Sequence, residues 1–347
     1  MDNFDEYLLQ GEPNKSEKAK AWKTAIGLQQ VDGLTPSEYL LASAKQNIEG
    51  EISLEDVKQR IDNYYQQQPL KSVENRTEEA DKVAVQITEL LNEKTFTFSA
   101  LAYLTIHRRL FQGIYNHAGI IRDYNITKAE WVLNGETVLY ANAENLKETL
   151  EYDLLQEKKF NFKGLSLVEI IEHLAYFTSD LWQIHPFGEG NTRTTAIFLI
   201  KYLRQLGFKE VNNDLFANHS LYFRNALVRA NYEDLANGIY KSKDYLIRFL
   251  ANLLLNENHS LKNRELHIHF SDTVKSNFDT VKPQNDTVNE TVFSLIEKNK
   301  QITTKELGEK LGVSLSTVKR KINSLKQSGV LERIGSDKAG FWRITTK

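Results

Sequence analysis

Apolar residues recur every three to four positions along most of this chain, the pattern of helices with one buried face. Between residues 16 and 68, this pattern and its Gly and Pro boundaries predict three helices, over 18–31, 37–48 and 53–65. Ser53 with Asp56 forms a capping-box pattern at the start of the third. Further helices are predicted over 81–91, 99–116, 146–156, 167–183, 194–206, 221–231 and 245–255. The body of the protein is therefore expected to be helical.

The segment AEWVLNGETVLYAN interrupts the helical pattern. Asn134-Gly135, the dipeptide that most favours a tight hairpin turn, separates two short apolar runs. Their members are Trp131, Val132, Leu133, Val138, Leu139 and Tyr140. Two strands alone are marginally stable, so we expect a small β-hairpin flap on the surface rather than part of the core.

The pattern changes again near the C-terminal end. Residues 258–290 are polar, contain Pro283 and repeat DTVK or DTVN every seven residues, which favours a linker over a heptad helix. Predicted helices over 291–298, 304–311 and 316–328 follow, and then the short strands VLERIG and GFWRIT. This order is typical of a winged helix-turn-helix domain of the α+β class, over 291–347.

The expected recognition helix of that domain carries Ser316, Thr317, Lys319 and Arg320. Side chains of these types suit contacts with DNA phosphates. Winged helices also dock proteins or form dimers, so DNA binding and a protein partner, including a homodimer, both stay open.

The composition and charge of the chain limit the classes of protein to which it can belong. The 347 residues are 41% hydrophobic and 26% charged, as in globular proteins, and the absence of cysteine excludes disulfides and thiolate metal sites. No signal-peptide pattern and no apolar run of about 20 residues is found, so we expect a cytoplasmic protein without a membrane partner. Residues 291–347 hold 12 Lys and Arg against 5 Asp and Glu, although the whole chain has a net charge of −2. The two parts are therefore expected to bind different partners.

The most informative stretch is HPFGEGNTR, which runs from His185 to Arg193. His185 is suited to take a proton near neutral pH, and Glu189 is a hard ligand suited to Mg²⁺ shared with phosphate oxygens. Gly190 allows a close backbone approach, and the following helix presents unpaired N–H groups to an anion. Asn191 could orient the loop or donate to a phosphate, and Arg193 could bind one. Together these residues predict phosphoryl or nucleotidyl transfer.

HPFGEGNTR resembles the signature HxFx(D/E)GN(G)R of Fic-domain proteins, most of which are adenylyltransferases. IHRRLFQGIYNHAGIIRDYN upstream, and YFRNALVRANYEDL and KDYLIRFL downstream, support the resemblance, which covers about residues 80–257. It implies an all-α Fic fold and transfer of AMP from ATP to a Tyr, Thr or Ser hydroxyl of a target protein, including the protein itself.

The resemblance also implies roles for individual residues. His185 would be the base, Phe187 would anchor the loop and Glu189 would hold Mg²⁺. ATP would be bound by Gly188, Gly190, Asn191, Thr192, Arg193 and Asn231. The hairpin would align the target by strand addition. Apart from the resemblance, we expect Arg122 to form a structural ion pair or to support the hairpin.

The chain departs from the family pattern at two positions. Thr192 replaces the usual second glycine, so one residue free to take a positive φ is lost. Ala196 replaces a second arginine that in the family binds the γ phosphate or pairs with an inhibitory glutamate. Another nucleotide donor is therefore conceivable.

A regulatory segment is also implied. Many Fic proteins carry an inhibitory pattern [S/T]xxxE[G/N], and here Leu28 and Asp32-Gly33 occupy its places. Asp32 is either an inhibitor of the nucleotide site or part of an ordinary helix end. We expect a helical region at 1–70, a catalytic Fic domain at 78–257, the linker and the winged helix. The function expected first is protein adenylylation; the alternative is a DNA-binding regulator whose Fic body is a sensor or interaction module.

Overall fold

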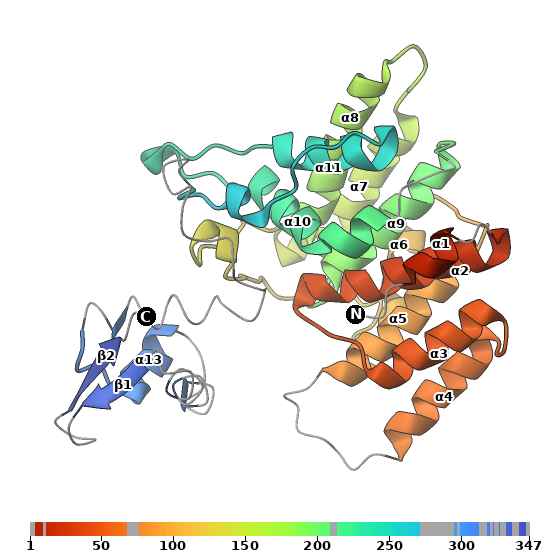
Figure 1. Cartoon of the computed structure of the whole chain (residues 1–347). Coiled ribbons are helices and arrows are strands. Elements are labelled where there is room, and N and C mark those ends of the chain that lie inside the picture. The colour runs from red at the N-terminus through yellow and green to blue at the C-terminus, as the bar shows by residue number, and fades with distance from the viewer. Residues whose placement is uncertain are drawn as a thin grey trace. The chain divides into compact units, whose positions relative to one another are not determined.

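The computed structural model describes residues 4–9, 12–67, 76–208 and 214–270, together with 295–296, 299–311, 318–319, 322, 326, 331–334 and 340–344. The chain divides into two compact units, Met1–Ser271 and Asp272–Lys347, hereafter the first and second unit. The first unit is helical, as predicted (Figure 1). No described helix is both long and apolar enough to span a bilayer.

Helices make up most of the first unit, and each predicted helix has a counterpart, although α1 was not predicted and α10 begins seven residues earlier than expected. The α-helices are α1 (Asp5–Leu9), α2 (Pro13–Gly27), α3 (Glu38–Glu49), α4 (Leu54–Gln66), α5 (Thr77–Asn92), α6 (Ala100–Phe111), α7 (Leu146–Lys159), α8 (Leu167–Ile184), α9 (Asn191–Gln205), α10 (Asp214–Asn231) and α11 (Asp244–Leu255). The 3₁₀ turns are η1 (Leu28–Asp32), η2 (Trp131–Leu133), η3 (Ala143–Asn145), η4 (Leu235–Asn237) and η5 (Asn263–Leu266).

Capping explains where several helices begin. The capping box predicted at Ser53 and Asp56 is present, and a second one, Ser166 with Glu169, starts α8. Helix α6 ends five residues earlier than predicted, at Phe111, and is followed by Gly113 with φ 80°. A positive φ is incompatible with a continuing right-handed helix, and glycine adopts it without strain.

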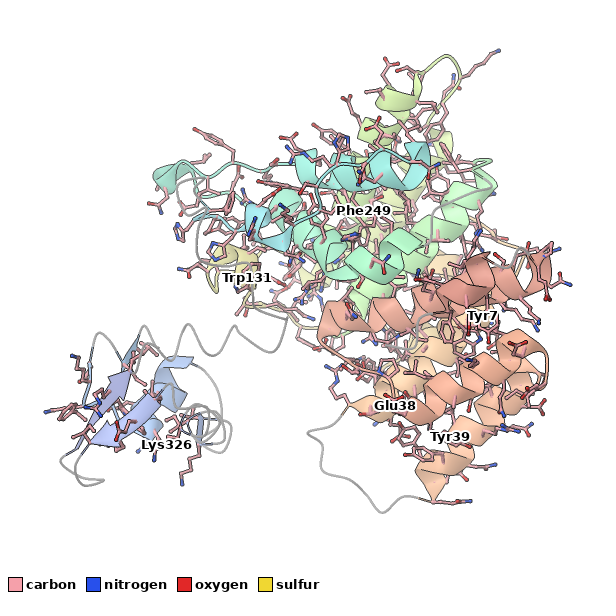
Figure 2. The ribbon with its side chains drawn as sticks, viewed as in Figure 1. Tyr7, Glu38, Tyr39, Trp131, Phe249 and Lys326 are labelled. Carbon is pink, nitrogen blue, oxygen red and sulfur yellow. The ribbon has the colours of Figure 1, made fainter. Side chains whose placement is uncertain are left out.

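One continuous apolar core joins the N-terminal helices to the rest of the first unit. Trp22 on α2 is fully buried, and its indole N–H donates to Asn47 Oδ1 at 3.0 Å. Phe249 on α11 packs against Phe216 and Phe223 of α10 in the same core (Figure 2). The N-terminal helices are therefore an integral part of this unit.

The predicted β-hairpin flap is wrong in its secondary structure. Residues Trp131–Leu133 form the 3₁₀ turn η2, and the strands that the structure describes, β1 and β2, both belong to the second unit. Val132 and Leu133 are both fully buried. Consecutive residues of a strand point to opposite faces, so a surface strand with one face on the core would bury only one of the two. Asn134 and Gly135 do form the predicted turn, with φ of 56° and 92°.

The end of the first unit lies inside the segment predicted as a linker. Leu266 is fully buried, the N–H of Ile268 donates to the Val132 carbonyl at 2.9 Å, and Asn225 on α10 donates to Asn263 at 2.8 Å. Residues 271–290 of that segment lie outside the described residues.

The second unit contains helix α13 (Thr304–Leu311) and strands β1 (Leu331–Ile334) and β2 (Phe341–Ile344). The strands pair antiparallel, with Leu331 opposite Ile344, where the sequence predicted them. Trp342 is buried, and its indole N–H donates to the Ile302 carbonyl at 2.9 Å. The second unit thus has a small core of its own, separate from that of the first unit.

Candidate active site

His185 ends helix α8 with its backbone in the left-handed region, at φ 51° and ψ 56°. A non-glycine residue in this region is uncommon, and it turns the chain sharply. Residues 186–190 then lead directly into α9. The imidazole is buried beside the rings of Tyr140 and Trp182, whose centroids lie 4.2 and 5.0 Å away.

The environment of His185 sets its tautomer and charge. Nδ1 lies 3.2 Å from the Trp182 carbonyl oxygen, which can only accept, so Nδ1 carries the ring proton and Nε2 is left as an acceptor. Burial, with a contribution from the charge of Lys128, lowers the pKa of His185 well below its usual 6.5. The ring is therefore neutral at pH 7, as a general base requires.

The loop after His185 is held rigidly by its own side chains. Asn191 Oδ1 accepts from the Phe187 N–H at 3.0 Å, and its Nδ2 donates to the Phe187 carbonyl at 2.7 Å. The Phe187 ring is buried and stacks on His107 at 3.6 Å between centroids. His107 Nδ1 accepts from the Gly119 N–H at 2.8 Å, so Nε2 donates to the Glu189 carbonyl at 3.0 Å. Burial lowers the pKa of His107 to about 3, and the ring is a neutral brace.

Gly190 joins this loop to α9. Its φ is 76°, and a Cβ atom here would lie 2.3 Å from two atoms of the Phe111 ring, so no other residue fits without movement. The next three residues, Asn191, Thr192 and Arg193, form the first turn of α9. The N–H groups of a first turn have no acceptor within the helix, and together with the helix dipole they favour an anion at this end.

Arg193 is fully buried and faces two carboxylates from earlier in the chain. Its Nη2 lies 2.7 Å from Glu79 Oε1 on α5 and 2.8 Å from Asp32 Oδ2 at the end of η1. Its Nη1 donates to Gln29 Oε1 at 3.1 Å. Burial alone would raise the pKa of Asp32, but the charges of Arg193, Arg224 and other nearby cations hold it below its usual value. Asp32 and Arg193 thus form a charged pair.

Glu189 lies on the exposed side of the loop. Its side chain is about half exposed and is 3.3 Å from Lys128 Nζ. Among the described residues, no group of three or more His, Asp or Glu side chains is arranged to hold a metal ion. A single carboxylate is nevertheless a normal protein ligand for Mg²⁺ when phosphate oxygens and water complete its shell.

The sequence of this region matches a known family. Residues 97–203 match the model of the Fic/DOC family, and residues 289–332 match that of winged helix-turn-helix DNA-binding domains. The chain contains a Fic/DOC domain. It also carries a winged helix-turn-helix domain near its C-terminal end.

Several curated proteins are similar to part of the chain. The protein adenylyltransferase VbhT of Bartonella schoenbuchensis is 30% identical over 103 residues, 30% of this chain and 20% of that protein. A protein adenylyltransferase of Bartonella henselae is 27% identical over 177 residues, 47% of this chain and 31% of that protein. The probable protein adenylyltransferase y4lH of Sinorhizobium fredii is 30% identical over 138 residues, 39% of this chain and 66% of that protein. The chain thus spans less than two thirds of the length of each.

A solved structure is also similar to the chain. The crystal structure of a Fic family protein from Desulfovibrio desulfuricans aligns with a TM-score of 0.46 and 13% identity, over 99% of this chain and 94% of that chain.

Several of the predicted site residues lie at the junction of α8 and α9. Gly188 lies against Tyr124, whose hydroxyl would be 2.7 Å from an added Cβ. Thr192 Oγ1 accepts from the Trp182 indole N–H at 3.0 Å, so its side chain is turned to α8. Asn231 is buried at the end of α10 and donates to the carbonyls of Ser179 and Leu227. Ala196 is fully buried.

Arg122 connects the loop that begins at His185 to the segment predicted as a flap. Its guanidinium donates to the carbonyl oxygens of His185, at 2.9 Å, of Ala141, at 2.7 Å, and of Tyr124. These acceptors are backbone carbonyls rather than carboxylates, so Arg122 supports the segment through hydrogen bonds and not through a structural ion pair. Val138 and Tyr140 are buried and Leu139 is 83% exposed, which is the alternation of an extended segment. Trp131 packs edge-on against His267 (Figure 2).

The structure places few of the residues predicted to contact DNA. Lys319 is exposed, whereas Ser316, Thr317 and Arg320 lie outside the described residues. Lys326, also exposed, has its Nζ 5.7 Å from the centre of the Trp342 ring (Figure 2).

Sequence reasoning missed two charged residues beside the motif, Glu79 and Arg224. Glu79 is 6% exposed and binds Arg193, and Arg224 donates to both carboxylate oxygens of Glu130 at 2.9–3.0 Å. Charged residues inside a helical repeat normally face water, so the signal was weak. Glu79 and Asp81 do lie among the apolar positions of α5, and a carboxylate there requires a buried partner.

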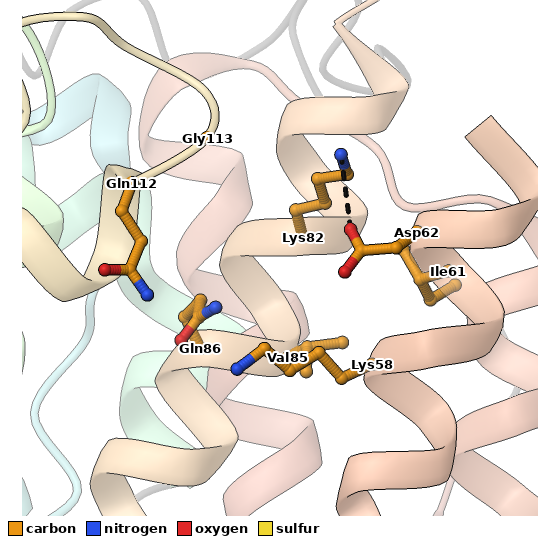
Figure 3. Close-up of a pocket in the computed structure, with 8 residues that line it drawn as sticks. All are labelled: Lys58, Ile61, Asp62, Lys82, Val85, Gln86, Gln112 and Gly113. Atoms are coloured by element: carbon orange, nitrogen blue, oxygen red, sulfur yellow. Dashed lines mark ion pairs between the residues drawn. The ribbon is translucent and has the colours of Figure 1, made fainter. Parts of the chain in front are cut away.

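The pocket shown in Figure 3 lies elsewhere in the first unit, between α4, α5 and the end of α6. It has a volume of about 250 Å³, and Ile61 and Val85 line it together with Lys58 and the ion pair of Lys82 and Asp62. None of its lining residues belongs to HPFGEGNTR, so it is separate from the candidate active site.

Proposed function

We propose that this protein transfers AMP from ATP to a hydroxyl group of a protein side chain. The observation that carries the proposal is the junction of α8 and α9, where a buried neutral imidazole with a free Nε2 adjoins the N-terminus of a helix. The base and the anion site are thus one short loop apart. The names of the curated relatives support the same activity.

The residues of the site suit the individual steps. His185 Nε2 takes the proton of the target hydroxyl, whose oxygen bonds to the α phosphorus while the bond from that phosphorus to the β-phosphate oxygen breaks. Pyrophosphate leaves with the electron pair of that bond. The first-turn amides of α9 and the Arg193 guanidinium neutralise the phosphates. Glu189 would hold Mg²⁺, which supplies further charge neutralisation on the phosphates.

Transfer of label from ATP carrying it on the α phosphate tests the proposal. We expect His185→Ala to lower labelling of the protein or of added target by at least about 100-fold, the usual contribution of a general base. His185→Asn should do the same while tolerating the left-handed backbone. His259→Ala, which changes an exposed histidine elsewhere, is the control. Undiminished labelling of both His185 variants would exclude the mechanism, and competition by unlabelled GTP or CTP would identify another donor.

A second candidate function rests on the match of residues 289–332 to winged helix-turn-helix DNA-binding domains. We propose that the second unit binds duplex DNA, in a protein whose Fic domain is either active or a sensor of nucleotides. The segment 291–347 has seven more basic than acidic residues. Retention on a duplex DNA column at low salt that is lost steeply as salt rises is the expected result. No retention at low salt would leave protein docking or a homodimer as the role of this unit.

A further inference from the structure

The charges of four cations from four different parts of the first unit act on the Asp32 carboxylate, and one of these cations, Arg193, contacts it directly. Arg193 belongs to α9 and is 2.8 Å away, and Arg224 of α10 donates to the carbonyl of the preceding residue, Val31, at 3.0 Å. Lys128 precedes η2, and Arg76 immediately precedes α5. The positive charge of all four acts on Asp32. One carboxylate therefore sits where several cations converge, as an anionic ligand would.

Arg76 and Arg193 share one oxygen atom. Glu79 Oε1 accepts from Arg76 Nη2 at 2.7 Å and from Arg193 Nη2 at 2.7 Å, and Tyr115 OH donates to it at 2.6 Å. Glu79 Oε2 accepts from Arg76 Nε at 2.6 Å. The two guanidinium groups are thus neighbours although they come from α9 and from the start of α5.

The two arginines differ in their exposure. Arg193 is fully buried, whereas the Arg76 side chain is 40% exposed. Arg76 occupies the N-cap of α5 but makes no side-chain cap hydrogen bond, and its guanidinium instead binds the Glu79 carboxylate. Arg76 is the second cation bound to Glu79, and it lies closer to the surface than Arg193. It can therefore contact a ligand that enters from solvent.

The charges of this cluster are balanced as long as Asp32 stays in place. Arg76 and Arg193 face Glu79 and Asp32, Arg224 is paired with Glu130, and Lys128 with Glu189. Withdrawal of Asp32 leaves the cluster with one uncompensated positive charge. An excess positive charge beside a helix N-terminus is suited to the next phosphate of a polyphosphate chain.

We propose that Arg76 binds the terminal phosphate of the nucleotide when Asp32 has left Arg193. The assignment rests on the proposed function, because it requires the inner phosphates to lie against Arg193. The three phosphates of ATP extend over a longer distance than one guanidinium can span. A second cation one turn further along α9 is not present, because that position is Ala196, which is fully buried and carries no charge. Arg76 provides the missing cation from another helix.

Nucleotide affinities measured by calorimetry test the assignment. In the full-length Asp32→Ala protein with Mg²⁺, we expect Arg76→Ala to weaken ATP binding by about tenfold, the size of one lost charge-assisted hydrogen bond. ADP, which lacks the terminal phosphate, should bind with unchanged affinity. Lys82→Ala is the matched control, because Lys82 lies on the same helix in an ion pair with Asp62 (Figure 3) and should change neither affinity.

The outcomes separate this assignment from the proposed function. Arg76→Lys keeps the charge without the planar fork and should recover part of the ATP affinity. If Arg76→Ala weakens ATP and ADP equally, or neither, the assignment is wrong while AMP transfer stands. If the Asp32→Ala protein binds no ATP at all, both the assignment and the proposed function are overturned.

Discussion

At the scale of single residues, the site is defined by which groups are charged. His185 is buried and neutral, and Arg193 is buried and charged with two carboxylates beside it. The N-terminal segment positions Asp32. Because Asp32 is paired with Arg193, this guanidinium is not available to a phosphate in the proposed site. The sequence suggested Asp32 as an inhibitor but assumed that Ala196 left it without an arginine. The structure corrects that expectation, since the partner of Asp32 is Arg193.

We therefore expect Asp32→Ala to raise the rate of AMP transfer several-fold. The substitution removes the ion pair with Arg193, and a pair that contributes about 1.4 kcal/mol corresponds to a tenfold change in the equilibrium between the blocked and the open site. The measurement is the initial rate of label incorporation at subsaturating ATP. Gln30→Ala, in the same 3₁₀ turn, should leave the rate unchanged. An unaltered rate in Asp32→Ala would mean that the pair is structural only.

The pH range over which this pair acts follows from the pKa of Asp32. The folded pKa is lowered, so the charged pair contributes to stability above the unfolded pKa near 3.8 and is lost only as pH falls through the still lower folded value. The pair consequently persists at any pH at which AMP transfer would be assayed.

At the scale of elements, the loop between α8 and α9 depends on close contacts between side chains and backbone. Asn191 closes the loop on Phe187, His107 holds the Glu189 carbonyl, and Phe111 fills the space beside Gly190. These contacts bring together residues from α6 and α9. They fix the loop geometry before any ligand binds, which lowers the cost of binding phosphate.

Gly190→Ala tests how much the loop depends on this packing. The new Cβ meets the Phe111 ring at 2.3 Å and the backbone has φ 76°, whereas Gly113, with φ 80°, has nothing within 4 Å of an added Cβ. We expect Gly113→Ala to cost about 1–2 kcal/mol of unfolding free energy from the backbone alone. Gly190→Ala should cost clearly more and should also abolish most of the transfer activity. Equal costs in urea denaturation would show that Phe111 moves aside freely.

Much of the architecture could be predicted from periodicity and capping residues, as the match of α4 to the Ser53 capping box shows. The motif also placed His185, Glu189 and Arg193 correctly at one helix junction. The prediction of a hairpin was wrong because Asn134-Gly135 signals a turn but not whether the segments on either side of it pair as strands. Val132 and Leu133 before the turn are both buried. Glu79 and Arg76 could not be assigned, because their role arises from contacts with residues more than 30 positions away.

At the scale of the whole molecule, the two units have separate cores. Ile302, Leu307 and Trp342 belong to the core of the second unit, and the core of the first unit contains none of them. A unit with a core of its own can lose its fold while another unit keeps its fold. The catalytic and DNA-binding proposals can therefore be tested independently in the intact chain.

Trp342→Ala is the variant that separates them. Truncation of a buried Trp costs about 3–5 kcal/mol, a large share of the stability of so small a domain. Retention on DNA should be lost and AMP transfer kept, whereas His185→Ala should show the reverse. Loss of both activities in Trp342→Ala would mean that the Fic domain depends on the second unit.

Arg224 has a consequence for how target binding and release of the N-terminal segment are related. One of its nitrogens donates to Val31, next to Asp32, and the other to Glu130, whose carbonyl accepts from Gly135 in the segment predicted to receive the target. Two sites that share a guanidinium are thermodynamically linked, and linkage is reciprocal. If a target binds this segment and favours a different position of Glu130, the hold on Val31 loosens, and departure of Asp32 alters the affinity for the target by the same factor. Target binding and release of Asp32 would then be two measurements of a single coupling free energy.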